Sequence, residues 1–148
     1  MICGPAFVCE YLHVGDDVYR DVYEPSEDSF LLIDALHVDL PDLVCRFGDT
    51  PISNVIEVGV GSGVVLTTYG LIWKQQCEQE QNATQNPLFW GSDINKRALA
   101  AAKDLLLHNN FAEEQLRLVE ANLFNGVPEG QLFDVIIFNP PYVVTDQQ

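Results

Sequence analysis

Short apolar runs alternate along this chain with segments whose apolar residues recur at helical spacing. Four runs rich in β-branched and aromatic residues have the length of buried strands, and they cover residues 54–60, 88–93, 116–123 and 133–138. Three segments predict helices, at residues 27–36, 64–74 and 96–108. Strands that alternate with helices predict right-handed crossovers and a parallel sheet, and therefore a single α/β domain over residues 1–148.

Local signals sharpen the predicted boundaries. Ser26 is a favourable N-cap for the first helix, and Pro41 marks the exit from that helix. The stretch 75–87 is rich in Gln, Glu and Asn and nearly empty of large apolar residues, which predicts a solvated insertion. The connection between the third and fourth strands is short, so we expect one helical turn there or none.

Charge and composition narrow the function classes. The chain carries 22 acidic and 7 basic side chains, a net charge of −15, and no basic run, so we expect no nucleic-acid partner. No apolar stretch reaches the length that spans a bilayer, and no basic segment leads the N-terminus. We therefore expect no membrane association and a cytoplasmic location, with the nucleus as a second one.

The four cysteines form no C-x-x-C pair and the histidines lie apart from them, so we expect no metal site.

A glycine-rich turn follows the first predicted strand. Gly59, Gly61 and Gly63 stand between that strand and the next helix, an arrangement that lets a ligand approach the backbone. Glu57 lies two residues before the first glycine, and an acid at this place favours a ligand with an ammonium group over a pyrophosphate. A purely structural turn is about as good an interpretation of the glycines alone.

Asp93 ends the second predicted strand. A carboxylate at the end of this strand can accept hydrogen bonds from both hydroxyls of a ribose. The alternative is a helix cap shared with Asn95. Taken together with the glycine turn, ribose binding is the better interpretation.

The tetrapeptide Asn139-Pro140-Pro141-Tyr142 follows the apolar run 135–138, which we expect to be a fully buried strand. Ligands bind at the carboxyl ends of such strands. Methylation of a planar nitrogen needs both of its hydrogens held and its lone pair aimed at the donor. The Asn139 oxygen and the Pro140 carbonyl can accept those two bonds, and Tyr142 can pack on the flat group.

These segments resemble the class I S-adenosylmethionine-dependent methyltransferases of the HemK type. The resemblance rests on Glu57-Val58-Gly59-Val60-Gly61-Ser62-Gly63, on Gly91-Ser92-Asp93-Ile94-Asn95 and on Phe138-Asn139-Pro140-Pro141-Tyr142. It is closest to the eukaryotic and archaeal branch, through Tyr23-Glu24-Pro25-Ser26-Glu27-Asp28-Ser29-Phe30 and the continuation Val143-Val144-Thr145.

The resemblance implies the catalytic subunit of the release factor glutamine methyltransferase, which uses S-adenosylmethionine. In that family the substrate is the glutamine of the GGQ motif of a class 1 translation termination factor, and a small zinc-binding activator protein pairs with the catalytic subunit. The implied cofactor residues are Glu57, Gly59 and Gly61 at the methionine end, Asp93 at the ribose, and Asn122 and Leu123 at the adenine, where the family usually has Asp-Leu. The implied substrate residues are Asn139, Pro140, Pro141 and Tyr142, with Asn139, Pro140 and Tyr142 as the catalytic ones.

The resemblance also implies a Rossmann-like sheet from which the family's last three strands are absent, because three further strands follow the tetrapeptide in the family. The fourth strand would then be a sheet edge. Two other functions stay open on the sequence: methylation of an exocyclic amino group of a nucleic acid base such as adenine, and a fragment that binds cofactor or activator without catalysis.

Overall fold

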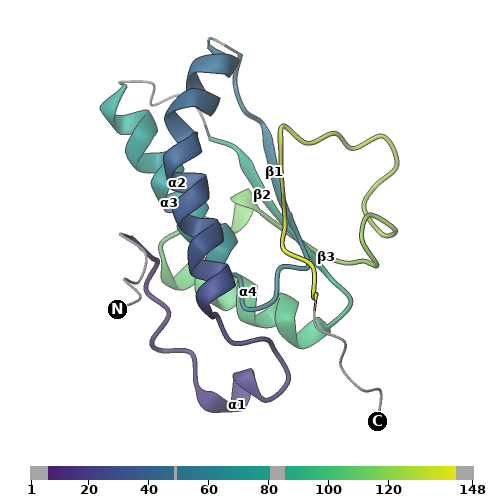
Figure 1. Ribbon diagram of the computed structural model, residues 1–148. Helices are drawn as coiled ribbons and strands as arrows, with labels where there is room; N and C mark the ends of the chain where they lie inside the picture. Colours follow the sequence, from purple (N-terminus) through teal and green to yellow (C-terminus); the bar gives the residue numbers. More distant parts are fainter. Residues whose placement is uncertain (1–6, 49, 81–85, 143–148) are drawn as a thin grey trace.

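The computed structural model describes residues 7–48, 50–80 and 86–142, and Figure 1 shows their arrangement. The segment 143–145, which carries part of the family resemblance, lies outside the described residues. In chain order the elements are α1 (Asp16–Tyr19), α2 (Glu27–Phe47), β1 (Asn54–Val58), α3 (Val64–Gln79), β2 (Leu88–Asp93), α4 (Lys96–His108), the short 3-10 helix η1 (Glu113–Gln115), β3 (Leu116–Glu120) and β4 (Val135–Phe138).

The four strands form one parallel sheet in the order β3-β2-β1-β4. This confirms the predicted α/β class and the alternation of strands with crossover helices. It also places β4 at an edge of the sheet. Between β3 and β4 the described residues contain no helix, so the chain returns to the far side of β1 through the irregular segment 121–134.

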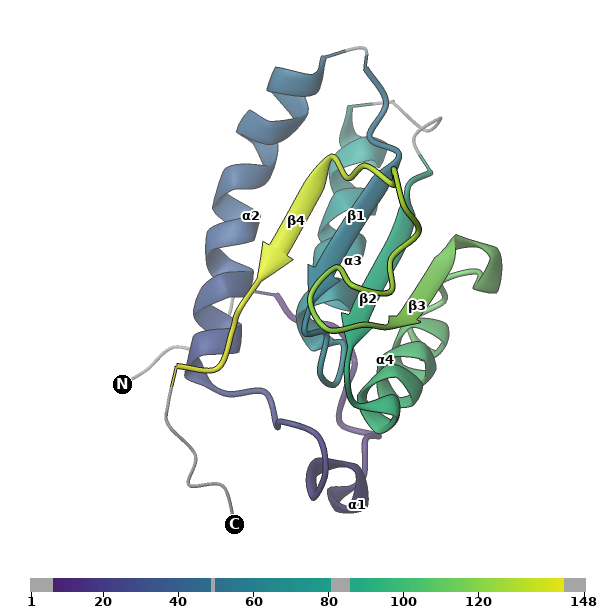
Figure 2. The same ribbon diagram turned by 90° about the vertical axis from the view of Figure 1, so that its right-hand side faces the viewer.

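Among the described residues, helices cover only one face of the sheet. In Figures 1 and 2, α2, α3 and α4 lie on one side of the strands, and the yellow-green segment 121–134 crosses the other side. The main core lies on the helical side and includes Ile33, Leu66 and Trp73. A smaller cluster of Ile56, Val58 and Trp90 lies on the opposite side, where Phe133 of the crossing segment packs edge-on against Trp90.

The helix α2 is about twice as long as predicted. It begins at Glu27, directly after the predicted N-cap Ser26, but it continues through Pro41 to Phe47. The prediction that Pro41 ends the helix is wrong, because Leu40 and Val44 on either side of it are buried in the main core and hold the last turns in place. Neither α2 nor another helix in the described ranges is long and apolar enough to cross a bilayer.

The predicted insertion at 75–87 also needs correction. Residues 75–79 continue α3 to Gln79, and Cys77 is buried in the main core. One inward residue in the last turn is enough to extend a helix whose other side chains there are polar and solvated. Residues 81–85 lie outside the described ranges.

The strand β4 is less buried than predicted. Of its four residues only Ile137 is buried, while Ile136 and Phe138 are 56% and 51% exposed. Buried and exposed residues alternate along β4 because the helices cover one face of the sheet. Ile137 faces the helices, and its neighbours face the side that the segment 121–134 partly covers.

We predict that Pro41→Ala stabilises the protein. Pro41 is exposed inside α2, where proline removes a backbone donor and strains the preceding turn, at a cost of about 3 kcal/mol. Alanine also makes the unfolded chain more flexible, so we expect a net gain of about 1–2 kcal/mol in the free energy of unfolding. Urea denaturation would measure it. Val38→Ala, at an exposed position in the same helix, is the control and should change the midpoint little; a less stable Pro41→Ala protein would contradict the prediction.

Candidate functional site

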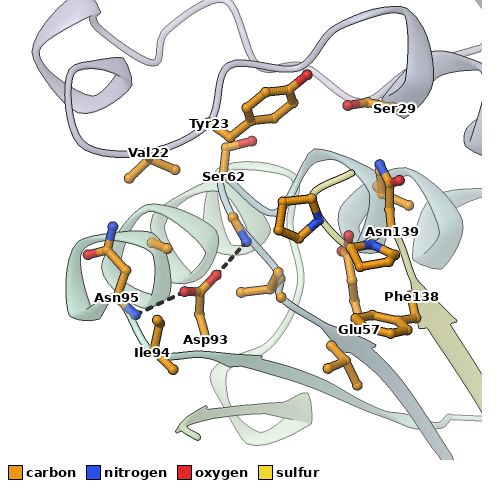
Figure 3. Close-up of a pocket in the computed structure, with 18 of the residues that line it drawn as sticks. Val22, Tyr23, Ser29, Glu57, Ser62, Asp93, Ile94, Asn95, Phe138 and Asn139 are labelled. Atoms are coloured by element: carbon orange, nitrogen blue, oxygen red, sulfur yellow. Dashed lines mark hydrogen bonds between the residues drawn. The ribbon is translucent and has the colours of Figure 1, made fainter. Parts of the chain in front are cut away.

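A pocket of about 760 Å³ lies at the carboxyl ends of the strands, where parallel sheets bind ligands. Figure 3 shows the residues that line it. All the site residues predicted from the sequence lie on its wall, namely Glu57, Gly59, Gly61, Asp93, Asn122, Leu123, Asn139, Pro140, Pro141 and Tyr142. The structure thus brings them together, and their individual roles stay predictions.

The register of the sheet explains this convergence. Val58 of β1 pairs with Ser92 of β2 and with Phe138 of β4. The next residues along these strands, Gly59, Asp93 and Asn139, therefore lie at the same level: Gly59 and Asn139 follow β1 and β4, and Asp93 is the last residue of β2. The glycine turn, the acid and the polar tetrapeptide meet because the strands that carry them end together.

The three glycines of the turn have different surroundings. All have positive φ, which side chains with a Cβ rarely adopt. A Cβ on Gly63 would come within 2.8 Å of Ala102 in α4, so this glycine is required by helix packing. A Cβ on Gly59 or Gly61 would meet no atom within 4 Å, so these two positions keep the backbone open toward the pocket.

Glu57 is a buried carboxyl at the base of the pocket. Its side chain is on the helical side of β1, and Oε2 accepts a hydrogen bond of 2.9 Å from the backbone N–H of Leu66 in α3. Burial raises the pKa of Glu57 to about 8, the charge of Asp93 adds to the rise, and the Leu66 hydrogen bond opposes it. A cationic group in the pocket would satisfy this carboxylate, which is otherwise costly to ionise.

Asp93 ties the glycine turn to the start of α4. Its Oδ2 accepts from the N–H of Gly61 at 3.0 Å, and its Oδ1 accepts from the N–H of Asn95 at 2.9 Å, as Figure 3 shows. The structural role that is the alternative to ribose binding, a helix cap shared with Asn95, is therefore present. A carboxylate has about four lone-pair sites, so two backbone bonds still leave acceptors for hydroxyl groups in the pocket.

Asn122 and Leu123 follow β3 and form the wall beyond Asp93. Both are exposed, and Leu123 has φ of 55°, a left-handed conformation that is uncommon for leucine. A tight turn, in which the N–H of Asn125 donates to the carbonyl of Asn122 at 3.0 Å, holds the pair. An apolar side chain held this way offers a flat contact surface for a ring.

The tetrapeptide after β4 forms the opposite wall. Asn139 is half-buried, and its Nδ2 donates to Oδ2 of Asp28 at 3.1 Å. Tyr142 is 75% exposed at the mouth. The turn therefore presents one anchored amide and one accessible aromatic ring.

The sequence analysis missed the contribution of the N-terminal segment. The pocket is also lined by Asp21, Val22, Tyr23, Pro25, Asp28 and Ser29. Asp28 and Ser29 stand in the first turn of α2. Their one sequence signal was the motif 23–30, which carried family resemblance but no assigned chemistry.

Contacts with α4 hold this segment over the pocket. Nδ2 of Asn95 donates to the Asp21 carbonyl at 2.7 Å, while its Oδ1 accepts from the N–H of Arg97 and caps the helix. The Arg97 guanidinium pairs with the Asp21 carboxylate. Asn95 and Arg97 thus anchor Asp21 near Asp93. Within the described ranges, no three His, Cys, Asp or Glu side chains gather as a metal would need.

Comparison with protein families gives a match that covers most of the chain. The model of the methyltransferase small domain family matches residues 41–148. This range contains the glycine turn, Asp93 and the tetrapeptide.

Individual relatives agree. The chain is 34% identical over 138 residues to mouse "Methyltransferase HEMK2", covering 91% of this chain and 55% of that protein. It is 30% identical over 134 residues to the Schizosaccharomyces pombe "eRF1 methyltransferase catalytic subunit mtq2", covering 86% and 53%. The chain thus spans about half the length of these relatives. Among solved structures, a type I restriction-modification methyltransferase subunit from Streptococcus thermophilus shares the fold, with a TM-score of 0.53 and 18% identity over 82% of this chain and 24% of that one.

We predict that, without ligand, the Glu57→Gln variant becomes more stable than the wild type as the pH rises. The folded state holds the Glu57 proton up to about pH 8, whereas the unfolded state releases it near 4.5. The contribution of Glu57 to the free energy of unfolding of the wild type is therefore fully present below pH 4.5, and it is lost as the pH rises from 4.5 to about 8. Glutamine keeps an acceptor for Leu66 and has no charge, so at pH 9 the variant should be more stable by a few kcal/mol.

Denaturant titrations at pH 5, 7 and 9 would measure this difference. Glu129→Gln removes an exposed carboxyl and is the control. A Glu57→Gln difference that stays constant from pH 5 to 9 would show that burial does not hold the proton on this carboxyl.

Proposed function

Because this chain belongs to the methyltransferase small domain family, we propose that it methylates the side-chain nitrogen of the GGQ glutamine of a class 1 translation release factor, with S-adenosylmethionine as methyl donor. The observation that carries the proposal is the position of Asn139 and its prolines. They line the β4 side of the pocket and Asp93 lines its β2 side, with Glu57 of β1 between them, so an acceptor nitrogen and a cofactor would meet in this one pocket. The printed name of the fission yeast relative supports the release factor as substrate.

The pocket wall fits the cofactor. Glu57 would accept from the ammonium group of the methionine end, and the open backbone at Gly59 and Gly61 would let that end approach closely. Asp93 would accept from the ribose hydroxyls with its remaining lone pairs. Asn122 and Leu123 would contact the adenine. When bound, S-adenosylmethionine supplies an electrophilic methyl group on a sulfonium.

The tetrapeptide fits a planar amide. An amide nitrogen is a poor nucleophile because its lone pair is delocalised into the carbonyl. The Asn139 oxygen and the Pro140 carbonyl would each accept one N–H, which holds the nitrogen in place and favours the charge that develops on it. Tyr142, exposed at the mouth, would pack on the flat face of the amide. Proton loss from the methylated nitrogen completes the transfer.

We also propose a partner and a location for the reaction. The name "catalytic subunit" of the fission yeast relative supports a second subunit there, and the family resemblance suggests a small zinc-binding activator. A release factor works in translation, so we place the reaction in the cytoplasm, with the nucleus as a second location.

We predict that Gly61→Ala weakens cofactor binding at a small cost in stability. Gly61 and Gly130 both have positive φ and open space where a Cβ would stand, but only Gly61 lines the pocket. Alanine at either position should cost about 1 kcal/mol of backbone strain. Calorimetry with S-adenosylmethionine should show affinity at least tenfold weaker for Gly61→Ala and unchanged for Gly130→Ala. Equal affinities in both variants would place the cofactor elsewhere.

The methyl acceptor can be identified directly. We expect labelled S-adenosylmethionine to label a class 1 release factor, but not a factor whose GGQ glutamine is replaced by alanine, and not duplex DNA. Asn139→Ala should lower the rate about 100-fold or more, because it removes an acceptor that orients the nitrogen. Label in DNA, or equal labelling of the factor without its glutamine, would refute the proposed substrate.

A further inference from the structure

A hydrogen bond joins two residues 111 positions apart at the acceptor side of the pocket. Nδ2 of Asn139, at the end of β4, donates to Oδ2 of Asp28, the second residue of α2, over 3.1 Å. In Figure 3 the Asn139 side chain extends from β4 toward the start of α2, which carries Ser29. Both residues line the pocket.

The Asp28 carboxylate is itself held in place. Its Oδ1 accepts from the Ser26 hydroxyl and from the Tyr23 hydroxyl at 3.3 Å, and these two hydroxyls lie 2.6 Å apart. The hydrogen bond from Ser26, followed by that from Asn139, holds the pKa of Asp28 below its ordinary value. The first turn of a helix also favours negative charge. Asp28 is therefore an ionised and fixed acceptor at neutral pH.

An ionised carboxylate only accepts hydrogen bonds, so it determines which end of the neighbouring amide faces it. Asn139 must turn its NH₂ group toward Asp28. Its Oδ1 is then the end available to the rest of the pocket. If the amide were rotated by 180°, Asn139 would present donors instead, and these would repel the N–H donors of a substrate amide and attract a carbonyl or carboxylate oxygen.

We propose that Asp28 is a positioning residue that fixes the orientation of the Asn139 amide, and thereby makes the pocket select an acceptor bearing a planar NH₂ group over one bearing only oxygens. The inference rests on the proposed function for its substrate, but the orientation itself is a property of the ligand-free protein. Asp28 acts through Asn139 and makes no contact with the reacting atoms in this role.

The first test is Asp28→Asn, which keeps the shape of the side chain and removes its acceptor-only character. Asn139 can then adopt both orientations, so we expect kcat/KM for the release factor to fall at least tenfold while the Kd for S-adenosylmethionine stays within twofold. Glu27→Gln is the matched control, since it removes the same charge from an exposed position in the same helical turn. Its kcat/KM should stay within twofold. Unchanged kcat/KM in Asp28→Asn, with an active wild type, would overturn the proposal.

An exchange of the two side chains tests positioning against a merely structural role. Asn139→Asp alone places two carboxylates together and should lower kcat/KM at least 100-fold. Combining it with Asp28→Asn restores a donor facing an acceptor, with an acceptor oxygen left for the substrate. The double variant should recover at least tenfold over Asn139→Asp. No recovery, with both proteins folded by circular dichroism, would contradict the proposed orientation.

A third measurement does not depend on the substrate. The side-chain NH₂ of Asn139 should give a ¹H–¹⁵N signal with one proton shifted and protected from exchange by Asp28, and Asp28→Asn should remove both effects. This result would support the fixed orientation even if the wild type fails to methylate the release factor, in which case only the proposed function fails. An Asn139 signal that is unaffected by Asp28→Asn overturns the positioning role whatever the substrate is.

Discussion

The parallel register of β1 with its two neighbours is the constraint on which the site depends. It places Gly59, Asp93 and Asn139 at one level, at the carboxyl ends of the three strands. Each residue then has its own local role. Gly59 lets the chain turn, Asp93 accepts hydrogen bonds from backbone N–H groups, and the prolines hold Asn139 at the end of its strand. A shift of one residue in either pairing would separate these groups by about 3.3 Å and reverse the faces of the strand.

Backbone N–H groups donate hydrogen bonds to both acidic side chains of this arrangement. Asp93 accepts from the turn and from the start of α4, and Glu57 accepts from α3. Both carboxylates therefore join elements that the sheet alone would leave independent. Burial of Glu57 opposes its ionisation, and a cationic group in the pocket would offset this cost.

The alternation of strands and helices, the glycine turn and the tetrapeptide could be predicted from the sequence because short-range patterns define them. The extension of α2 past Pro41 could not, since it depends on where Leu40 and Val44 find their core partners. The exposure of Phe138 depends likewise on which sheet face lacks helices. The segment 21–25 was missed as a pocket wall because its anchors, Asn95 and Arg97, lie more than 70 residues away.

The residues 21–29 touch both sides of the pocket. At one end Asp21 is held by Asn95 and Arg97, close to Asp93 at the end of β2. At the other end Asp28 holds Asn139 after β4. Eight positions of chain thus connect the wall that fits a cofactor with the wall that fits an acceptor. This segment therefore constrains the distance between the two walls together with the strands, whose register brings both walls to one end of the sheet.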